Sequence, residues 1–144
     1  MQIRSLMKKV ALLLITLVLI SCQSKVKKEE LSKLNGYWEI KKVVQENGED
    51  KDYKINETID YLEVKNNQGF RQKVMPQFDG KYKTNGIQEN IKIIDKDTDY
   101  FIEYSTPYGK WQEKIVEIKD STLILLNKDK IEYQYKRYAP FSLK

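Results

Sequence analysis

From Trp38 onward, apolar side chains recur at every second position in short runs, and this alternation constrains the fold more than any other feature of the chain. A period of two predicts strands with one buried face, whereas a helix would repeat its apolar positions every 3.6 residues. The pairs that share a face are Trp38 with Ile40, Leu62 with Val64, and Ile91 with Ile93. The sequence therefore predicts an all-β fold.

Segments rich in glycine, asparagine and aspartate separate these runs, and such residues favour tight turns. Eight or nine short strands fit between the turns, at the spacing of hairpins, which predicts an antiparallel sandwich or barrel. Residues 50–58 lack a clear pattern, so we expect a longer loop there. The expected turns are 46–50, 66–69, 78–80, 84–86, 95–99, 106–110, 119–121 and 127–129.

The first 21 residues have the composition of a secretory signal peptide. Arg4, Lys8 and Lys9 form a positive start, and a run of apolar residues from Val10 to Ile20 follows. That run is too short to span a bilayer comfortably, because a membrane helix needs about 20 apolar residues. We therefore expect residues 1–21 to be removed.

The end of this leader, Leu19-Ile20-Ser21-Cys22, resembles the lipobox of bacterial lipoproteins. The resemblance implies cleavage before Cys22 and attachment of lipid to its sulfur, which would place the protein on a membrane. Cys22 is the one cysteine of the chain, so a lipidated protein would have no thiol for catalysis, metal binding or a disulfide. The alternative is an ordinary buried thiol.

Residues 22–33 are interpreted as the lipidated cysteine and a polar tether. Lys28-Glu29-Glu30 is similar to the short signals that send some lipoproteins to the cell surface, although a solvated linker explains it equally well. Leu31 and Leu34 lie three residues apart, so one helical turn there could plug the open end of a barrel.

The charge pattern argues against nucleic-acid binding. The chain has 26 basic and 21 acidic residues, and loss of the leader removes three of the basic ones. Nucleic-acid binding needs a clustered basic face, whereas the lysines here alternate with acids.

Gly36-Tyr37-Trp38, together with Arg137 near the end of the chain, resembles the lipocalins and especially the small lipocalin-like lipoproteins of bacteria. The resemblance implies that residues 34–144 form one up-and-down barrel of eight or nine antiparallel strands. It also implies that Gly36 and Trp38 lie at the closed end of the barrel, with Arg137 across the tryptophan ring.

Several aromatic and apolar residues fall on strands where such a barrel has its inside. An eight-stranded barrel is wide enough either to be filled by side chains or to hold one small ligand, and both alternatives stay open. The predicted lining of a ligand cavity is Tyr82, Tyr100, Ile102, Tyr104, Trp111, Tyr133 and Tyr135.

Few catalytic or metal-binding arrangements are possible. The chain has no histidine, which excludes histidine triads and histidine zinc sites. Glu113 and Glu117 share a predicted strand face, and we interpret them as outward charges rather than as a catalytic pair. Asp95, Asp97 and Asp99 open like a calcium loop, but Tyr100 and Thr106 stand where its glycine and closing glutamate belong.

We therefore expect a non-enzymatic, monomeric lipoprotein of the cell envelope, on the outer membrane, that binds a small apolar or amphipathic molecule without cofactor or metal. The alternative is an interaction protein with a filled barrel that engages an envelope protein or a glycan through its outer face or loops. An enzyme with paired carboxylates is the third alternative.

Overall fold

The computed structural model describes residues 2–17 and 25–140. Helix α1 (Gln2–Leu17) covers most of the predicted leader. Within the described residues, no helix has both the length and the apolar character needed to cross a bilayer. The lipobox residues 19–22 lie outside the described part of the chain, so lipidation of Cys22 stays a prediction.

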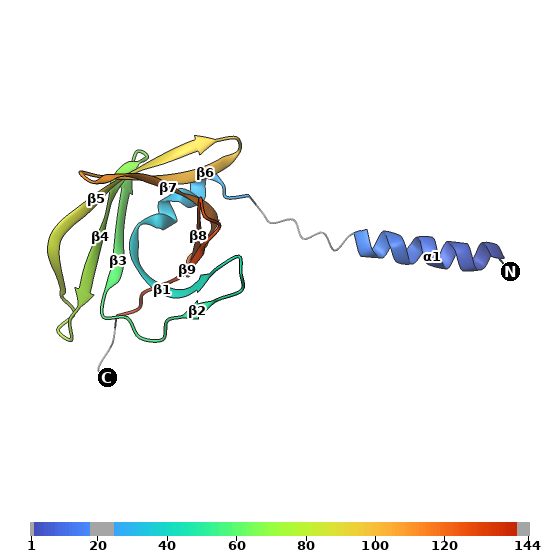
Figure 1. The fold of residues 1–144 in the computed structure, drawn as a ribbon, viewed down its shortest axis with the longest axis horizontal. Coiled ribbons are helices and arrows are strands. Elements are labelled where there is room, and N and C mark those ends of the chain that lie inside the picture. The colour runs from blue at the N-terminus through green and yellow to red at the C-terminus, as the bar shows by residue number, and fades with distance from the viewer. Residues whose placement is uncertain (1, 18–24, 141–144) are drawn as a thin grey trace.

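The remainder is a sheet of nine antiparallel strands, eight of which close into a barrel (Figure 1). Closure comes from β1, which pairs with β3 on one side and with the last strand on the other. The strands are β1 (Gly36–Val44), β2 (Lys51–Asp52), β3 (Ile59–Lys65), β4 (Gln68–Pro76), β5 (Tyr82–Lys96), β6 (Asp99–Thr106), β7 (Gly109–Ile118), β8 (Thr122–Asn127) and β9 (Glu132–Arg137). The predicted all-β, up-and-down barrel is confirmed.

Two segments differ from the simplest hairpin pattern. Residues 50–58 contain the two-residue strand β2, which pairs with Lys42 and Val43 near the end of β1 and does not join the barrel wall. Thr84-Asn85-Gly86 is predicted as a turn between strands, but it lies inside β5, where the pairing with β4 shifts. The shift is a bulge, which bends a strand without ending it.

The barrel has one closed and one open end. The 3-10 helix η1 (Lys28–Leu34) closes the first, and its Leu31 and Leu34 are buried in the core. Hairpin turns 66–67, 97–98 and 119–121 lie at this closed end. The connections 45–58, 77–81, 107–108 and 128–131 lie at the open end, because successive connections of an up-and-down barrel alternate between the two ends.

Trp38 forms the floor of the core and is fully buried. Its indole Nε1 donates a hydrogen bond of 2.8 Å to the carbonyl oxygen of Leu34, which satisfies the polar atom that burial would otherwise leave unpaired. The ring therefore connects η1 to the first barrel strand.

Arg137 is the last residue of β9, and its side chain reaches across the closed end of the barrel. Its guanidinium carbon lies 3.9 Å from the centroid of the Trp38 ring. Its nitrogen atoms donate to the carbonyl oxygens of Lys33 (2.8 Å), Asn35 (2.6 Å) and Asp120 (2.9 Å). One side chain thus holds η1, the start of β1 and the β7–β8 turn together.

Gly36 makes this approach possible. A Cβ atom there would lie 2.7 Å from Arg137 Nη1. The backbone has a φ of +120°, a conformation that residues other than glycine rarely adopt. Glycine, tryptophan and arginine therefore form one packing unit at the closed end.

Candidate functional site

Six of the seven residues predicted to line a cavity contribute to the barrel core. Ile102 and Tyr104 are fully buried, and Tyr135 is nearly so. Tyr100, Trp111 and Tyr133 are partly buried and pack against the core cluster. Trp111 stacks on Tyr104, its cross-strand partner, with ring centroids 5.2 Å apart. These residues come from β6, β7 and β9, and their role in binding a ligand stays a prediction.

Tyr82 lies on the outer face instead. Its ring stacks on Tyr37 with centroids 4.2 Å apart, and Tyr37 points outward because its neighbour Trp38 points inward. The prediction for Tyr82 treated Thr84-Asn85-Gly86 as a strand end. Since β5 continues through that segment, Tyr82 is out of phase with the inward residues Ile91 and Ile93.

Glu113 is the second correction. It is buried, at 8% exposure, and points into the barrel between Trp111 and Ile115 on the inward row of β7. A bulge between Ile115 and Glu117 shifts the register with β8, so Glu117 lies on the opposite face. The two glutamates therefore form no carboxylate pair.

Glu113 is part of a polar cluster inside the barrel that sequence reasoning missed. Arg71 on β4 forms an ion pair with Glu89 on β5, and its guanidinium carbon lies 4.2 Å from the centroid of the Tyr104 ring. A cation over an aromatic face is stabilised by the ring quadrupole, more so when water is excluded. Arg71 therefore lies sandwiched between the acid and the aromatic wall.

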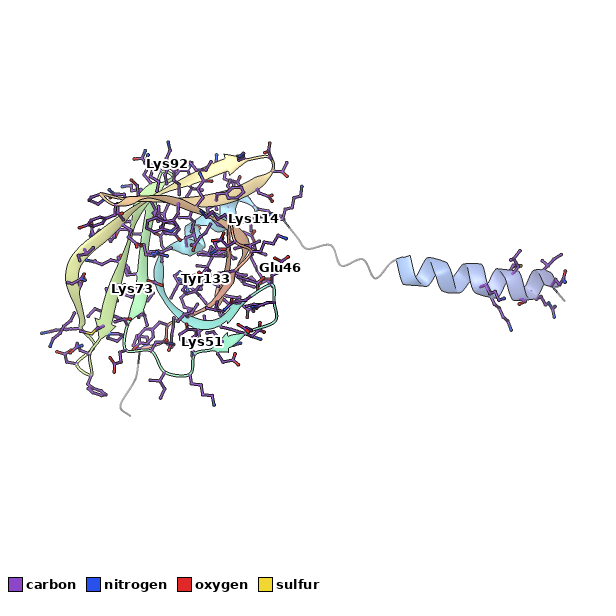
Figure 2. The ribbon with its side chains drawn as sticks, in the orientation of Figure 1. Glu46, Lys51, Lys73, Lys92, Lys114 and Tyr133 are labelled. Atoms are coloured by element: carbon purple, nitrogen blue, oxygen red, sulfur yellow. The ribbon has the colours of Figure 1, made fainter. Side chains whose placement is uncertain are left out.

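A second ion pair lies beside the first. Lys73 Nζ is 2.7 Å from Asp60 Oδ1, between directly opposite positions of β3 and β4. Asp60 Oδ1 accepts no hydrogen bond, so the contact is an ion pair only. The Asp60 side chain is buried, whereas the Lys73 side chain is largely exposed. Figure 2 labels Lys73 on β4 and Tyr133 on β9, on opposite sides of the ring of strands.

Burial controls the proton affinities within this polar cluster. It raises the pKa of the Glu113 carboxyl, and the nearby Tyr104 hydroxyl and Arg71 oppose that rise only in part. Burial also holds the pKa values of Tyr104 and Tyr135 well above their usual range. For Arg71, burial alone would lower the pKa, but Tyr104 and Glu89 raise it. The arginine stays charged and the phenols stay neutral.

Three buried oxygen atoms of the interior have no hydrogen-bond partner among the described residues: Asp60 Oδ1, the Tyr104 hydroxyl and Glu113 Oε2. Asp60 Oδ1 is in an ion pair with Lys73, which leaves the Tyr104 hydroxyl and Glu113 Oε2. They influence each other's pKa values, so they are neighbours, but their geometry falls short of a hydrogen bond. Buried polar atoms left unpaired are costly, which makes this pair the polar centre of the interior.

The closed half of the barrel is filled. The space among the core side chains above Trp38 leaves no room for a water molecule, and it is bounded by Trp38, Leu62, Leu123, Leu125 and Tyr135 together with Asp60, Arg71 and Tyr104 of the polar interior. Any small molecule inside the barrel would have to lie nearer the open end, above Tyr104 and beside Trp111 and Tyr133. A ligand cavity toward the open end therefore stays a prediction.

An outer groove of about 380 Å³ lies where β6 and β7 separate. Pairing between these strands ends at Phe101 and Lys114. The gap beyond is lined by Val26, Tyr100, Ile115 and Leu126.

Within the described residues, no group of three or more acids or cysteines is placed to hold a metal ion.

Comparison with known proteins gives a family match. The model of the lipocalin-like domain family matches residues 34–125. A search of curated proteins finds no match.

Solved structures of similar fold include a lipocalin-like protein from Bacteroides uniformis, at 12% identity and a TM-score of 0.47, covering 74% of this chain and 99% of the other. Apocrustacyanin C1 and apocrustacyanin C2 each align at 12% identity and a TM-score of 0.48, covering 81% of this chain and 67% of theirs. The family match spans most of the barrel, and the chain belongs to the lipocalin-like domain family.

Proposed function

We propose that this protein is a lipid-anchored component of the cell envelope that binds one small amphipathic molecule at the open end of its barrel. The observation that carries the proposal is the layered interior. The closed half is packed solid, whereas the half toward the open end combines aromatic walls with the unpaired oxygens of Tyr104 and Glu113. Ligand pockets of this kind join apolar surface to a few polar groups that fix orientation.

Within this proposal, Trp111 and Tyr133 contact the apolar part of the ligand. Both are only partly buried and pack against the core, so they offer aromatic surface toward the mouth. The polar end of the ligand faces Tyr104 and Glu113. The Tyr104 hydroxyl, whose pKa burial holds well above its usual range, is neutral and can donate a hydrogen bond, so the ligand carries an acceptor oxygen.

The anchoring part of the proposal rests on the lipobox at Leu19-Ile20-Ser21-Cys22. A lipidated Cys22 would place the protein on a membrane of the envelope, and we propose that this is the outer membrane. The surface-signal hypothesis for Lys28-Glu29-Glu30 competes with a structural role, since Glu30 Oε2 accepts a hydrogen bond of 2.8 Å from the Lys27 backbone at the start of η1.

Native mass spectrometry of protein purified gently from its own host tests ligand binding. We expect one additional small-molecule mass per chain, identified after extraction. Trp111→Ala and Tyr133→Ala should each reduce the ligand-bound fraction by tenfold or more, whereas Tyr37→Ala on the outer face should leave it unchanged. A chain that carries no ligand and takes up no fluorescent fatty acid would contradict the proposal.

The alternative function is an interaction protein with a filled barrel. It is favoured by the absence of water-sized space around Trp38 and Leu125 and by an outer aromatic cluster. That cluster comprises Tyr37, Tyr61, Phe70, Tyr82 and Tyr138. An empty barrel in the mass spectrometry experiment would shift the search to envelope proteins and glycans that contact this face.

A further inference from the structure

We propose that the barrel is seated with its closed end against the membrane and its mouth facing the aqueous compartment, so that ligand enters and leaves from water and not from the lipid layer. This inference rests on the proposed lipidation of Cys22. It follows from where the chain first becomes fixed to the barrel and from how little chain precedes that point.

The chain is attached to the closed end from Lys25 onward. Lys25 Nζ donates a hydrogen bond of 2.9 Å to Thr98 Oγ1 in the β5–β6 turn. Val26 packs against the core cluster, and η1 begins at Lys28. In Figure 1 the segment leading into η1 passes the barrel beside β6. Most of the predicted tether is therefore part of the folded domain.

Only Gln23 and Ser24 separate Cys22 from this attachment. Consecutive Cα atoms are 3.8 Å apart, so the Cα of Cys22 lies within about 11 Å of the Cα of Lys25. An acyl group on Cys22 inserts at the membrane surface. The closed end therefore lies about 11 Å or less from the attachment point of the lipid.

The mouth is too far away to reach the same surface. β1 has nine residues, and at about 3.3 Å per residue a strand of that length extends for about 30 Å. A tilt of 35–45° in a closed barrel leaves a height of about 20 to 25 Å. That height exceeds the reach of the free segment by about a factor of two, so the short tether keeps the mouth off the membrane.

The exposed apolar residues of the barrel show what the short tether prevents, which is insertion of the open-end rim into the bilayer. Ile55, Met75, Phe78, Ile87 and Tyr108 are the exposed large apolar side chains described in residues 25–140. Ile55, Phe78 and Tyr108 lie in the open-end connections and Met75 lies next to one, whereas Ile87 lies within β5 where its pairing with β4 shifts. A freely tethered barrel could insert this rim into the bilayer. Fixed by Lys25 and Val26, the barrel presents the rim to water, where an amphipathic ligand can meet it.

The charges agree with this orientation. Within residues 25–35, 65–68, 96–99 and 119–121 at the closed end, seven lysines stand against five acids. Within residues 45–58, 76–82, 106–110 and 127–131 at the open end, six lysines stand against seven acids. Anionic lipid headgroups attract the end with excess lysine, so electrostatics favours the seating that the tether length imposes.

Two single-cysteine variants of the full-length lipidated protein test the orientation. Lys96→Cys labels the closed end and Tyr108→Cys, at a residue 99% exposed, labels the mouth. Cys22 does not compete for the label when its sulfur carries lipid. In phosphatidylglycerol-containing vesicles with a nitroxide on the headgroup, we expect fluorophore quenching at position 96 to exceed that at position 108 at least threefold.

Vesicle flotation distinguishes failure of the proposed orientation from failure of the proposed anchor. Protein that floats but shows equal quenching at both sites, or stronger quenching at position 108, would overturn the orientation while leaving the anchor intact. Protein that does not float would overturn the anchor, and the orientation with it.

A spacer variant tests the role of the short tether. Twenty Gly/Ser residues inserted between Ser24 and Lys25 span about 25 Å on average, which is enough for the rim to reach the bilayer. We expect the quenching ratio to fall toward one in this variant. An unchanged ratio would show that tether length does not orient the barrel and would overturn the argument.

Discussion

Trp38 is the residue whose burial contributes most clearly to the closed end. It is fully buried, its Nε1 is hydrogen-bonded to Leu34, and its face is covered by Arg137. Trp38→Ala should lower the free energy of unfolding by ~3 to 5 kcal/mol, because it leaves a cavity that the surrounding strands cannot close. Urea denaturation of the soluble domain measures this loss.

Trp38→Phe is the matched control. It keeps much of the apolar surface and removes the hydrogen bond to the Leu34 carbonyl, so a loss of only about 1 to 2 kcal/mol is expected. A loss below 1 kcal/mol for Trp38→Ala would contradict the placement of the ring in the core.

Glu113 should make stability depend on pH. Burial raises its folded-state pKa above the ordinary value of 4.5, so ionisation is easier in the unfolded chain. The stability contribution of this group is fully present below pH 4.5 and is lost as the pH rises through the folded-state pKa. Glu113→Gln cannot ionise and should not lose stability in this way. The free energy of unfolding of the variant, relative to that of the native chain, should therefore increase from pH 4 to pH 8.

Urea unfolding at several pH values measures this difference, with Glu117→Gln as the control. Glu117 lies on the outer face beside Lys119 and is about a third exposed, so its substitution should leave the pH dependence almost unchanged. Parallel pH profiles for Glu113→Gln and the native chain would show that Glu113 titrates normally.

At the scale of elements, Arg137 connects three segments that the strand pairing alone leaves separate. Its hydrogen bonds reach Lys33 in η1, Asn35 before β1, and Asp120 in the β7–β8 turn. Arg137→Lys keeps the charge but cannot reproduce the planar fork of donors. We expect a loss of about 2 kcal/mol and faster hydrogen exchange at the amides of η1.

Lys136→Ala is the neighbouring control. Lys136 is half exposed and pairs with Glu39 at 3.3 Å on the outer face, and exposed ion pairs contribute at most about 1 kcal/mol. If Arg137→Lys were as mild as this control and left exchange in η1 unchanged, the connecting role of Arg137 would be wrong.

The elements also show how far sequence reasoning reaches. Alternation and turn residues were enough to predict the strands and an antiparallel sandwich or barrel, because apolar rows such as Ile91 and Ile93 point unambiguously inward. The choice of a barrel came from the resemblance to the lipocalins. The helical turn at Leu31 and Leu34 could be predicted from spacing alone. These features depend on local pattern, which a single sequence displays directly.

The polar interior could not be predicted in the same way. On β4, hydrophobicity favours Phe70 and Val74 as the inward row, yet the structure turns Arg71 and Lys73 inward. The charged row is tolerated because Glu89 and Asp60 lie on the neighbouring strands. Only the three-dimensional pairing reveals those partners. It also reveals that β5 continues through residues 84–86, which places Tyr82 outside, and that a bulge in β7 turns Glu117 away from the face of Glu113.

At the scale of the whole molecule, the proposed anchor decides where this barrel works. In this proposal, one cysteine that carries several acyl chains would hold the domain. Each buried CH₂ contributes ~0.8 kcal/mol, so such an anchor would be durable where a single chain would exchange. Cys22→Ser removes the acylated sulfur without altering any described contact of the barrel. We expect more than nine-tenths of this variant to leave the membrane fraction.

Ser21→Ala is the matched control, because alanine keeps the small side chain before the cut and should leave the protein in the membrane fraction. Fractionation of the host with detergent phase separation measures both variants, and the mass of the amino-terminal peptide reports the lipid. Membrane retention of Cys22→Ser would contradict the lipobox assignment. The short distance between Cys22 and Lys25 would then no longer restrain the barrel, and its exposed rim at Ile55, Phe78 and Tyr108 would be free to approach any surface.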